Sequence, residues 1–201
     1  MNGASLSYNK VRNPMPSGQF SPGRAGGPAL EAVIRSNVRN VSPASVLKFE
    51  GDKHSAIFCV LDGWLSLSKS LVDGQTQIID FALPGDFVDV AGADGATCSV
   101  TLKAVTGSTI AVVPVAVWKK LMRNTPEAQG VDAQMAAAAR ARISERMLRL
   151  GKGSAEKRVA YALLELCTRI HASDTAVTDS FHIPLRQQQL GDFVGLSSVH
   201  V

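Results

Sequence analysis

The chain has 201 residues, of which 45% are hydrophobic and 19% are charged, a balance typical of a folded protein with an apolar core. Its three cysteines lie in no Cys-x-x-Cys pair and cannot form a disulfide framework, which favours a reducing, cytoplasmic compartment. No apolar run reaches about 18 residues, and residues 1–28 lack the apolar segment of a secretory signal, so we expect neither a membrane span nor a signal peptide.

The net charge of +4 is unevenly distributed along the chain. Between residues 41 and 130, seven lysines and arginines face nine carboxylates, whereas between 134 and 171 eight face three. A basic helical stretch suits a polyanion such as nucleic acid, although a solvated helix surface has the same composition. Charge alone leaves both interpretations open.

The spacing of apolar residues changes twice in the first half of the chain. Residues 1–28 are rich in Asn, Pro and Gly and predict a disordered tail. Residues 29–40 have apolar side chains at helical spacing. From about 44 to 115, short apolar runs alternate with turns such as Asp-Gly at 62–63 and 73–74, which indicates an antiparallel sandwich or barrel.

Helical periodicity returns after residue 115. A short helix is expected to end at Thr125-Pro126, and a long helix covers roughly 126–150. The apolar stripe of this long helix consists of Met135, Ala139, Ile143, Met147 and Leu150. So narrow a stripe favours pairing with the same helix of a second chain, the alternative being packing on the chain's own sheet. We therefore expect a homodimer.

The last fifty residues predict a helix-turn-helix. A basic helix is expected over 155–171, followed by a polar loop and a short strand at 181–185. A helix over 186–194, a turn at Gly195-Leu196 and a second helix beginning at Ser197 complete the pattern, which other corners between two helices also produce.

The order of these parts resembles the Crp/Fnr family of bacterial transcription regulators. The resemblance covers about 30–201 and rests on PGDF at 84–87, SAEKRVAYALLEL at 154–166 and QLGDFVGLS at 189–197. It implies an α+β protein with an antiparallel, jelly-roll-like β-roll as sensor domain, a long dimerisation helix and a winged helix-turn-helix. The corresponding ranges are 29–124, 125–151 and 154–201, the last expected to be incomplete because the family's recognition helix and wing continue further.

The resemblance also locates an effector pocket. In cyclic-AMP-binding members a Gly-Glu pair soon follows PGDF and an Arg-Ser pair comes a short loop later, the Glu holding the ribose and the Arg the cyclic phosphate. The corresponding residues here are Asp89, Val90, Cys98 and Ser99. A phosphate there would meet an added carboxylate and no guanidinium. We expect the pocket not to bind cyclic AMP, and either to bind an unknown small-molecule effector or to be a folded relic.

Cofactor-based sensing is not expected. Iron–sulfur members need a cysteine cluster near the N-terminus, and residues 1–58 contain no cysteine. A haem sensor needs an axial ligand in the β-roll, for which His54 and Cys59 are the candidates, but His54 falls in a polar turn. We predict no cofactor and no metal site. Cys98 is either a redox switch or an ordinary buried thiol.

For the DNA-binding part, the resemblance implies contacts to a palindromic operator by the full-length parent, and RNA polymerase as a further partner. The candidate DNA-binding residues are Arg186, Gln188, Ser197, Ser198 and His200. By the family pattern Ser198 would face bases, and Arg186, Gln188 and His200 would contact phosphates.

Two alternatives to a regulator are considered. A metal-dependent β-roll enzyme needs several His and a Glu, but His54 is the only histidine between 41 and 130, and no GxSxG, P-loop or GxGxxG motif occurs. We therefore expect no enzyme activity. The other alternative is a dimeric effector-binding or interaction protein without sequence-specific DNA binding.

Overall fold

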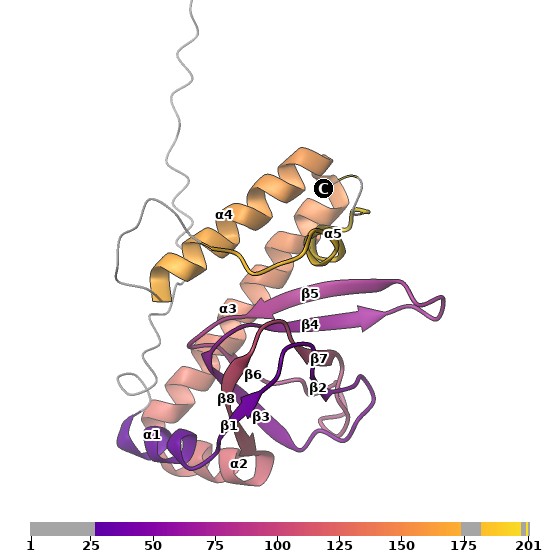
Figure 1. The fold of residues 1–201 in the computed structure, drawn as a ribbon. Helices are drawn as coiled ribbons and strands as arrows, with labels where there is room; N and C mark the ends of the chain where they lie inside the picture. The colour runs from indigo at the N-terminus through magenta and orange to yellow at the C-terminus, as the bar shows by residue number, and fades with distance from the viewer. Residues whose placement is uncertain (1–26, 174–181, 198–199, 201) are drawn as a thin grey trace, which may run out of the picture.

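The computed structural model describes residues 27–173, 182–197 and His200 (Figure 1). The predicted disordered tail therefore lies outside the described residues up to position 26. Helix α1 spans Gly27–Arg35 and ends earlier than the expected 29–40. The reason is that the end of the expected helix forms a strand instead, in which Val38 pairs with Ala111 of a neighbouring strand.

Eight strands form the β-roll, and they confirm the predicted α+β class with an antiparallel roll. They are β1 (Val38–Val41), β2 (Val46–Lys48), β3 (Ala56–Asp62), β4 (Leu65–Ser70), β5 (Thr76–Ala82), β6 (Phe87–Val88), β7 (Thr101–Ala104) and β8 (Ser108–Pro114). Two four-stranded sheets have the orders β1-β8-β3-β6 and β2-β7-β4-β5, with every pair antiparallel.

The apolar core between the two sheets accounts for the short apolar runs from which the strands are predicted. Phe58, Val60 and Ile110 of one sheet pack with Leu65 and Leu102 of the other. The turn between β3 and β4 depends on Gly63, whose positive φ of 80° and close approach to Ser108 leave no room for a side chain.

Four further helices follow the roll: α2 (Val115–Asn124), α3 (Pro126–Lys152), α4 (Ala155–Ser173) and α5 (Gln187–Val194). Pro126 at the first position of α3 separates it from α2, as expected. α3 continues two residues beyond the predicted end, because Gly151 stays helical and the helix is closed instead by the Gly153 N–H on the Arg149 carbonyl. Its 27 residues make a rod of about 40 Å.

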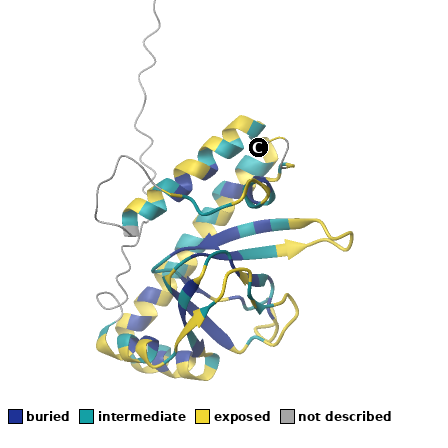
Figure 2. Ribbon diagram, viewed as in Figure 1, coloured by how far each residue is buried: buried dark blue, intermediate teal, exposed yellow. Residues whose placement is uncertain are grey.

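α3 runs along the whole molecule, from α1 and α2 at one end to α4 and α5 at the other (Figure 1). At the first end, Trp118 and Val131 pack with Leu30 against the outer face of β3 and β8. At the second end, Phe193 and Leu166 pack with Phe81 of β5. Figure 2 shows that α3 is buried only in part, with exposed residues along most of its length.

The segment before α5 differs from the prediction. A strand was expected over 181–185, but residues 182–186 have no regular structure, and Phe181 lies outside the described residues. Residues 182–186 pair with no strand among the described residues, and Ile183 and Leu185 instead pack on the core between β5, α4 and α5. Among the described residues, no helix is both long and apolar enough to cross a membrane.

Candidate functional site

The four residues predicted for the effector pocket lie together at the exit of β6 and the loop that follows it. Asp89 is exposed, and Val90 accepts hydrogen bonds from the Ser99 N–H at 2.8 Å and the Ser99 hydroxyl at 3.3 Å. Val90 and Cys98 are part of the apolar core between the sheets. Of the four, only Asp89 and Ser99 thus present polar side-chain atoms.

His54 lies beside Asp89 of this loop, a contact that the sequence did not predict. It was predicted to lie in a polar turn, yet its side chain is only 6% exposed. Its Nε2 lies 2.9 Å from Asp89 Oδ1, and its Nδ1 lies 3.4 Å from the Gly95 carbonyl oxygen. Backbone hydrogen bonds from Gly51 to Cys98 and from Cys98 to Asp52 bring the two loops together.

Two buried thiols of the β-roll, Cys59 and Cys98, lack the features of a reactive cysteine. Burial and the nearby Asp86 raise the pKa of Cys59 to about 12. Burial, with Asp52 and Asp89, also raises the pKa of Cys98, and Lys48 opposes this shift. Both thiols are therefore protonated near neutral pH, whereas reactive cysteines have lowered pKa values. Among the described residues, no group of three or more His, Cys, Asp or Glu is placed to hold a metal ion.

The residues of the predicted dimer stripe divide along α3. Met135 packs against the chain's own core beside Trp118, and Ala139 and Leu150 are half-buried. Ile143 is 46% exposed and Met147 is 71% exposed. These two residues border an apolar groove of about 130 Å³ between α3 and β5, which also includes Ile78.

The predicted DNA contacts lie around α5. Arg186 precedes α5, and its N–H donates to the Gln189 side chain at 2.9 Å. Arg186, Gln188, Ser197 and His200 are all exposed, while Ser198 lies outside the described residues. The Ser197 hydroxyl lies 2.7 Å from His200 Nδ1. The turn after α5 is present as predicted, with Gly195 in the left-handed conformation at a φ of 68°.

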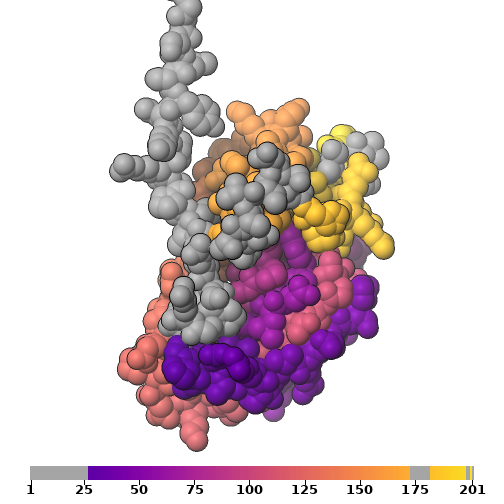
Figure 3. Space-filling view, turned by 60° about the vertical axis from the view of Figure 1, so that its left-hand side comes forward, coloured from indigo at the N-terminus to yellow at the C-terminus, as the bar shows by residue number. Residues whose placement is uncertain are grey.

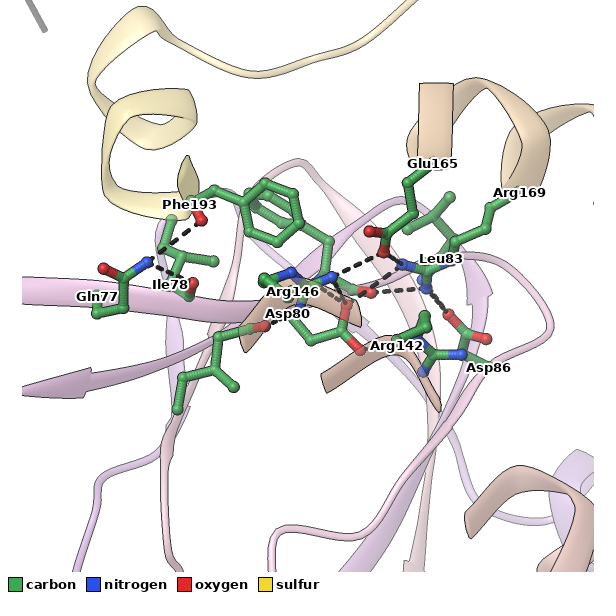
Figure 4. Close-up of polar contacts among 12 residues, drawn as sticks. Gln77, Ile78, Asp80, Leu83, Asp86, Arg142, Arg146, Glu165, Arg169 and Phe193 are labelled. Atoms are coloured by element: carbon green, nitrogen blue, oxygen red, sulfur yellow. Dashed lines mark hydrogen bonds and ion pairs between the residues drawn. The ribbon is translucent and has the colours of Figure 1, made fainter. Parts of the chain in front are cut away.

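A buried cluster of charges joins the roll to α3 and α4 and was not predicted (Figure 4). Asp80 of β5 lies at its centre. Arg142 Nε is 3.0 Å from Asp80 Oδ2, while Arg146 and Arg169 each approach Oδ1 at 3.3 Å. Arg146 also binds Glu165 at 2.7 Å. We call Asp80, Asp86, Arg142, Arg146, Glu165 and Arg169 the charge cluster.

The arginines of the charge cluster keep Asp80 ionised. Burial by itself would raise the pKa of Asp80, but the positive charges of Arg169, Arg142 and Arg146 outweigh it and lower the pKa. Burial would likewise lower the pKa of Arg169, yet Asp86, Asp80 and Glu165 raise it. Arg169 also donates to Asp86 at 2.6 Å and to the Phe81 carbonyl at 2.7 Å.

Next to the charge cluster, α5 packs directly on β5. The Gln77 amide donates to the carbonyls of Asp192 and Phe193, the latter at 3.2 Å. The Phe193 ring lies 4.8 Å from that of Phe81, and the guanidinium of Arg146 stacks over it at 4.2 Å. In the space-filling view, α4 and α5 lie against the strands of the roll (Figure 3). The first helix of the predicted helix-turn-helix is thus fixed to the sensor domain.

The cyclic nucleotide-binding domain family matches residues 38–125, from β1 to the end of α2. The chain is 30% identical over 155 residues to the transcriptional activatory protein AadR of Rhodopseudomonas palustris, covering 77% of this chain and 64% of AadR. FixK2 from Bradyrhizobium japonicum has the same fold, with a TM-score of 0.73 and 23% identity over 81% of this chain and 79% of FixK2. A transcriptional regulator of the Crp/Fnr family from Eubacterium rectale superposes with a TM-score of 0.61 at 16% identity, over 84% and 77%.

The chain is similar to Crp/Fnr regulators over most of its length. The match to AadR extends well beyond the β-roll, and the superposition with FixK2 covers most of both chains. These Crp/Fnr relatives are named as transcription regulators, not enzymes, as the sequence predicted. The chain spans slightly less than two thirds of the length of the curated Crp/Fnr relatives that it matches.

Proposed function

We propose that this protein is a DNA-binding transcription regulator of the Crp/Fnr family that acts as a homodimer in the cytoplasm. The observation that carries the proposal is the helix α5 with its left-handed turn at Gly195, held on the sensor domain with Arg186, Gln188 and His200 exposed. Exposed side chains of these types at a helix-turn-helix suit contacts to a phosphate backbone. RNA polymerase and an unknown effector are the further partners of this proposal.

The exposed stripe on α3 supports the homodimer. Among the described residues, Ile143 is 46% exposed and Met147 is 71% exposed, and the apolar groove beside them continues the same surface toward β5. Pairing with α3 of a second copy would bury this surface from both sides, as in other long-helix dimers. A symmetric pair would present two copies of α5 to a two-fold symmetric DNA site.

The loop after β6 supports an effector other than cyclic AMP. Its exposed carboxylate, Asp89, is next to His54, and the position of the family's arginine is taken by Cys98, which is buried in the core. A cyclic phosphate would meet the carboxylate without a guanidinium to balance its charge. With millimolar cyclic AMP, calorimetry on the protein should show no binding heat, and a dissociation constant in the low micromolar range would contradict the proposal.

A second candidate function is supported by the positions of the basic residues. Of the eight lysines and arginines between 134 and 171, five contact groups of their own chain. They are Arg142, Arg146, Arg149, Arg158 and Arg169. Arg158, a cation of the basic helix α4, donates to the carbonyls of Gly153 and Gly195. This arrangement favours a dimeric effector-binding or interaction protein without sequence-specific DNA binding.

A titration with duplex DNA tests whether this chain binds DNA and whether it distinguishes sequences. The 201-residue protein is titrated at low and moderate salt with two-fold symmetric duplexes, whose half-sites are about one helical turn apart, and with scrambled duplexes. We expect weak, salt-sensitive binding that does not distinguish them, since phosphate contacts supply affinity without specificity. Arg186→Ala should weaken this DNA binding, whereas Lys119→Ala, at an exposed position of α2, should not.

The other outcomes of the titration are equally informative. No binding at low salt would favour the interaction protein over the DNA-binding regulator. Preference for a symmetric site by more than about tenfold, which is 1.4 kcal/mol, would show that residues up to Val201 suffice to read bases.

A further inference from the structure

A groove between the end of α3 and the start of α4 has no role in the functions proposed above. It has a volume of about 410 Å³, and its lining includes Leu148, Tyr161 and Leu164, which we call its floor, and the cations Arg149, Lys152 and Lys157, which we call its rim. It lies outside the predicted dimer stripe, because successive residues of a helix point about 100° apart and Leu148 therefore faces away from Met147.

The floor of this groove is unusually apolar for a surface. Leu148 is 60% exposed and Leu164 is 61% exposed, and the two come from different helices on either side of the same hollow. Single exposed leucines are common on protein surfaces, but a cluster that lines a concave site marks a place where another molecule binds. The floor would gain free energy from any apolar side chain that covers it.

The charges around the groove all have one sign. Three of its lining residues are cations and none is a carboxylate. The guanidinium of Arg149 lies 3.2 Å from the centroid of the Tyr161 ring, and its two terminal nitrogens are buried without a hydrogen-bond acceptor in the described part of the chain. The Glu145 carboxylate lies 3.8 Å away, beyond hydrogen-bond distance. The cations that a carboxylate of another molecule can reach are therefore Lys152 and Lys157, both of which are exposed.

We propose that this groove is a docking site for an acidic peptide segment of another protein, whose apolar side chains cover Leu148 and Leu164 while its carboxylates pair with the cationic rim. Three other occupants are disfavoured. Residues 1–26 of this chain contain Lys10, Arg12 and Arg24 and no carboxylate, and a second copy of the groove would bring like charges together. Duplex DNA would pair with the rim but would leave the leucine floor uncovered.

Fluorescence anisotropy with a labelled synthetic peptide tests the proposal. The peptide carries leucines at i and i+4 on an otherwise acidic helix, and a second peptide has the leucines replaced by serine. We expect saturable binding of the first on the order of 10 µM and at least about tenfold weaker binding of the second. Leu164→Ser and Lys157→Glu should each weaken binding of the first peptide by about tenfold.

Two matched variants control for general effects of charge and polarity. Lys119→Glu on exposed α2 changes the net charge as much as Lys157→Glu does, and Val72→Ser at the exposed tip of the β4–β5 hairpin removes a comparable apolar side chain. Both should leave peptide affinity within about twofold of the original, a change of only ~0.4 kcal/mol. Unchanged thermal midpoints for the four variants would show that each still folds.

Three results would overturn the proposal. Equal losses in Lys119→Glu and Lys157→Glu would reduce the binding to general attraction of an acidic peptide. Competition by unrelated duplex DNA, together with no effect of Leu164→Ser, would assign the groove to nucleic acid. Conversion of a dimer to a monomer by Leu148→Ser in sedimentation would assign it to a second copy of the chain.

Discussion

The two sides of α3 in its C-terminal third reverse the usual distribution of residues. Arg146 is 8% exposed and faces the roll, whereas the next residue, Met147, points away and is largely exposed. Arginine is rarely buried unless it is paired, and methionine is commonly buried. On the first side the partners, Asp80 and Glu165, belong to the same chain. On the other side Met147 stays largely exposed among the described residues, which indicates that burial on α3 follows the available partners more than polarity.

Among the variants that test the charged side of α3, Asp80→Asn is expected to have the largest effect on stability. This change leaves three arginines around a neutral amide in a buried site, and an uncompensated buried charge is strongly unfavourable. We expect the free energy of unfolding to fall by about 3–5 kcal/mol, measured by urea denaturation. Asp62→Asn, at the exposed end of β3, should change it by less than about 0.5 kcal/mol and serves as the control.

The pH dependence of the stability difference between the original protein and Asp80→Asn tests whether the charge of Asp80 causes that difference. Because the pKa of Asp80 is lowered in the folded protein, its stabilising charge is fully present above its ordinary value of 3.8. The charge is lost as the pH falls through the lower folded-state value. The difference in stability between the two proteins should therefore be constant near neutral pH and narrow in acid. A difference that stays constant in acid would contradict the role assigned to the ionised Asp80.

The apolar side of α3 is tested by Ile143→Asp together with Met147→Asp. In one chain these residues are exposed, so the variant should fold normally. In a dimer the two carboxylates would be buried in the interface without partners. We expect association to weaken at least about a hundredfold, or roughly 2.7 kcal/mol, in analytical ultracentrifugation. An original protein that is monomeric at tens of micromolar would contradict the assignment of this stripe.

The smallest expected effect concerns the link between β5 and α5, at the edge of the charge cluster. Gln77→Ala removes the donor to the carbonyls of Asp192 and Phe193, which we expect to destabilise the docking of α5 by about 1 kcal/mol. Hydrogen exchange of the α5 amides should then become about fivefold faster, while the β-roll amides stay unchanged. Gln75→Ala, at the exposed hairpin tip, is the control. Unchanged exchange in α5 would show that packing of Phe193 alone holds this helix.

The elements that the sequence predicted well are those with a local signal. Alternating apolar residues and Asp-Gly turns gave the roll, and Thr125-Pro126 gave the boundary between α2 and α3. The strand predicted at 181–185 was wrong, because a short apolar run also occurs where side chains pack on a core without strand pairing.

The parts that could not be predicted depend on contacts between distant segments. His54 reaches Asp89 only because the loop after β6 bonds back to residues 51–52. The charge cluster did leave a trace: Asp80 interrupts an apolar strand, and arginines recur four residues apart at 142 and 146. A carboxylate in a buried run signals that a cation must cover it, but the sequence does not show which one.

The length of chain between the members of the charge cluster has a consequence for protein synthesis. The roll is complete only with β8, which ends at Pro114, and Arg169 follows Pro114 by 55 residues, so at about 5–20 residues per second Arg169 leaves the ribosome roughly 3–11 s after the last strand. A β-roll of this kind folds in milliseconds to seconds. The roll therefore has time to close before its counter-charges are made, with Asp80 still hydrated on its surface. Docking of α3 and α4 is then the step at which this carboxylate first leaves water.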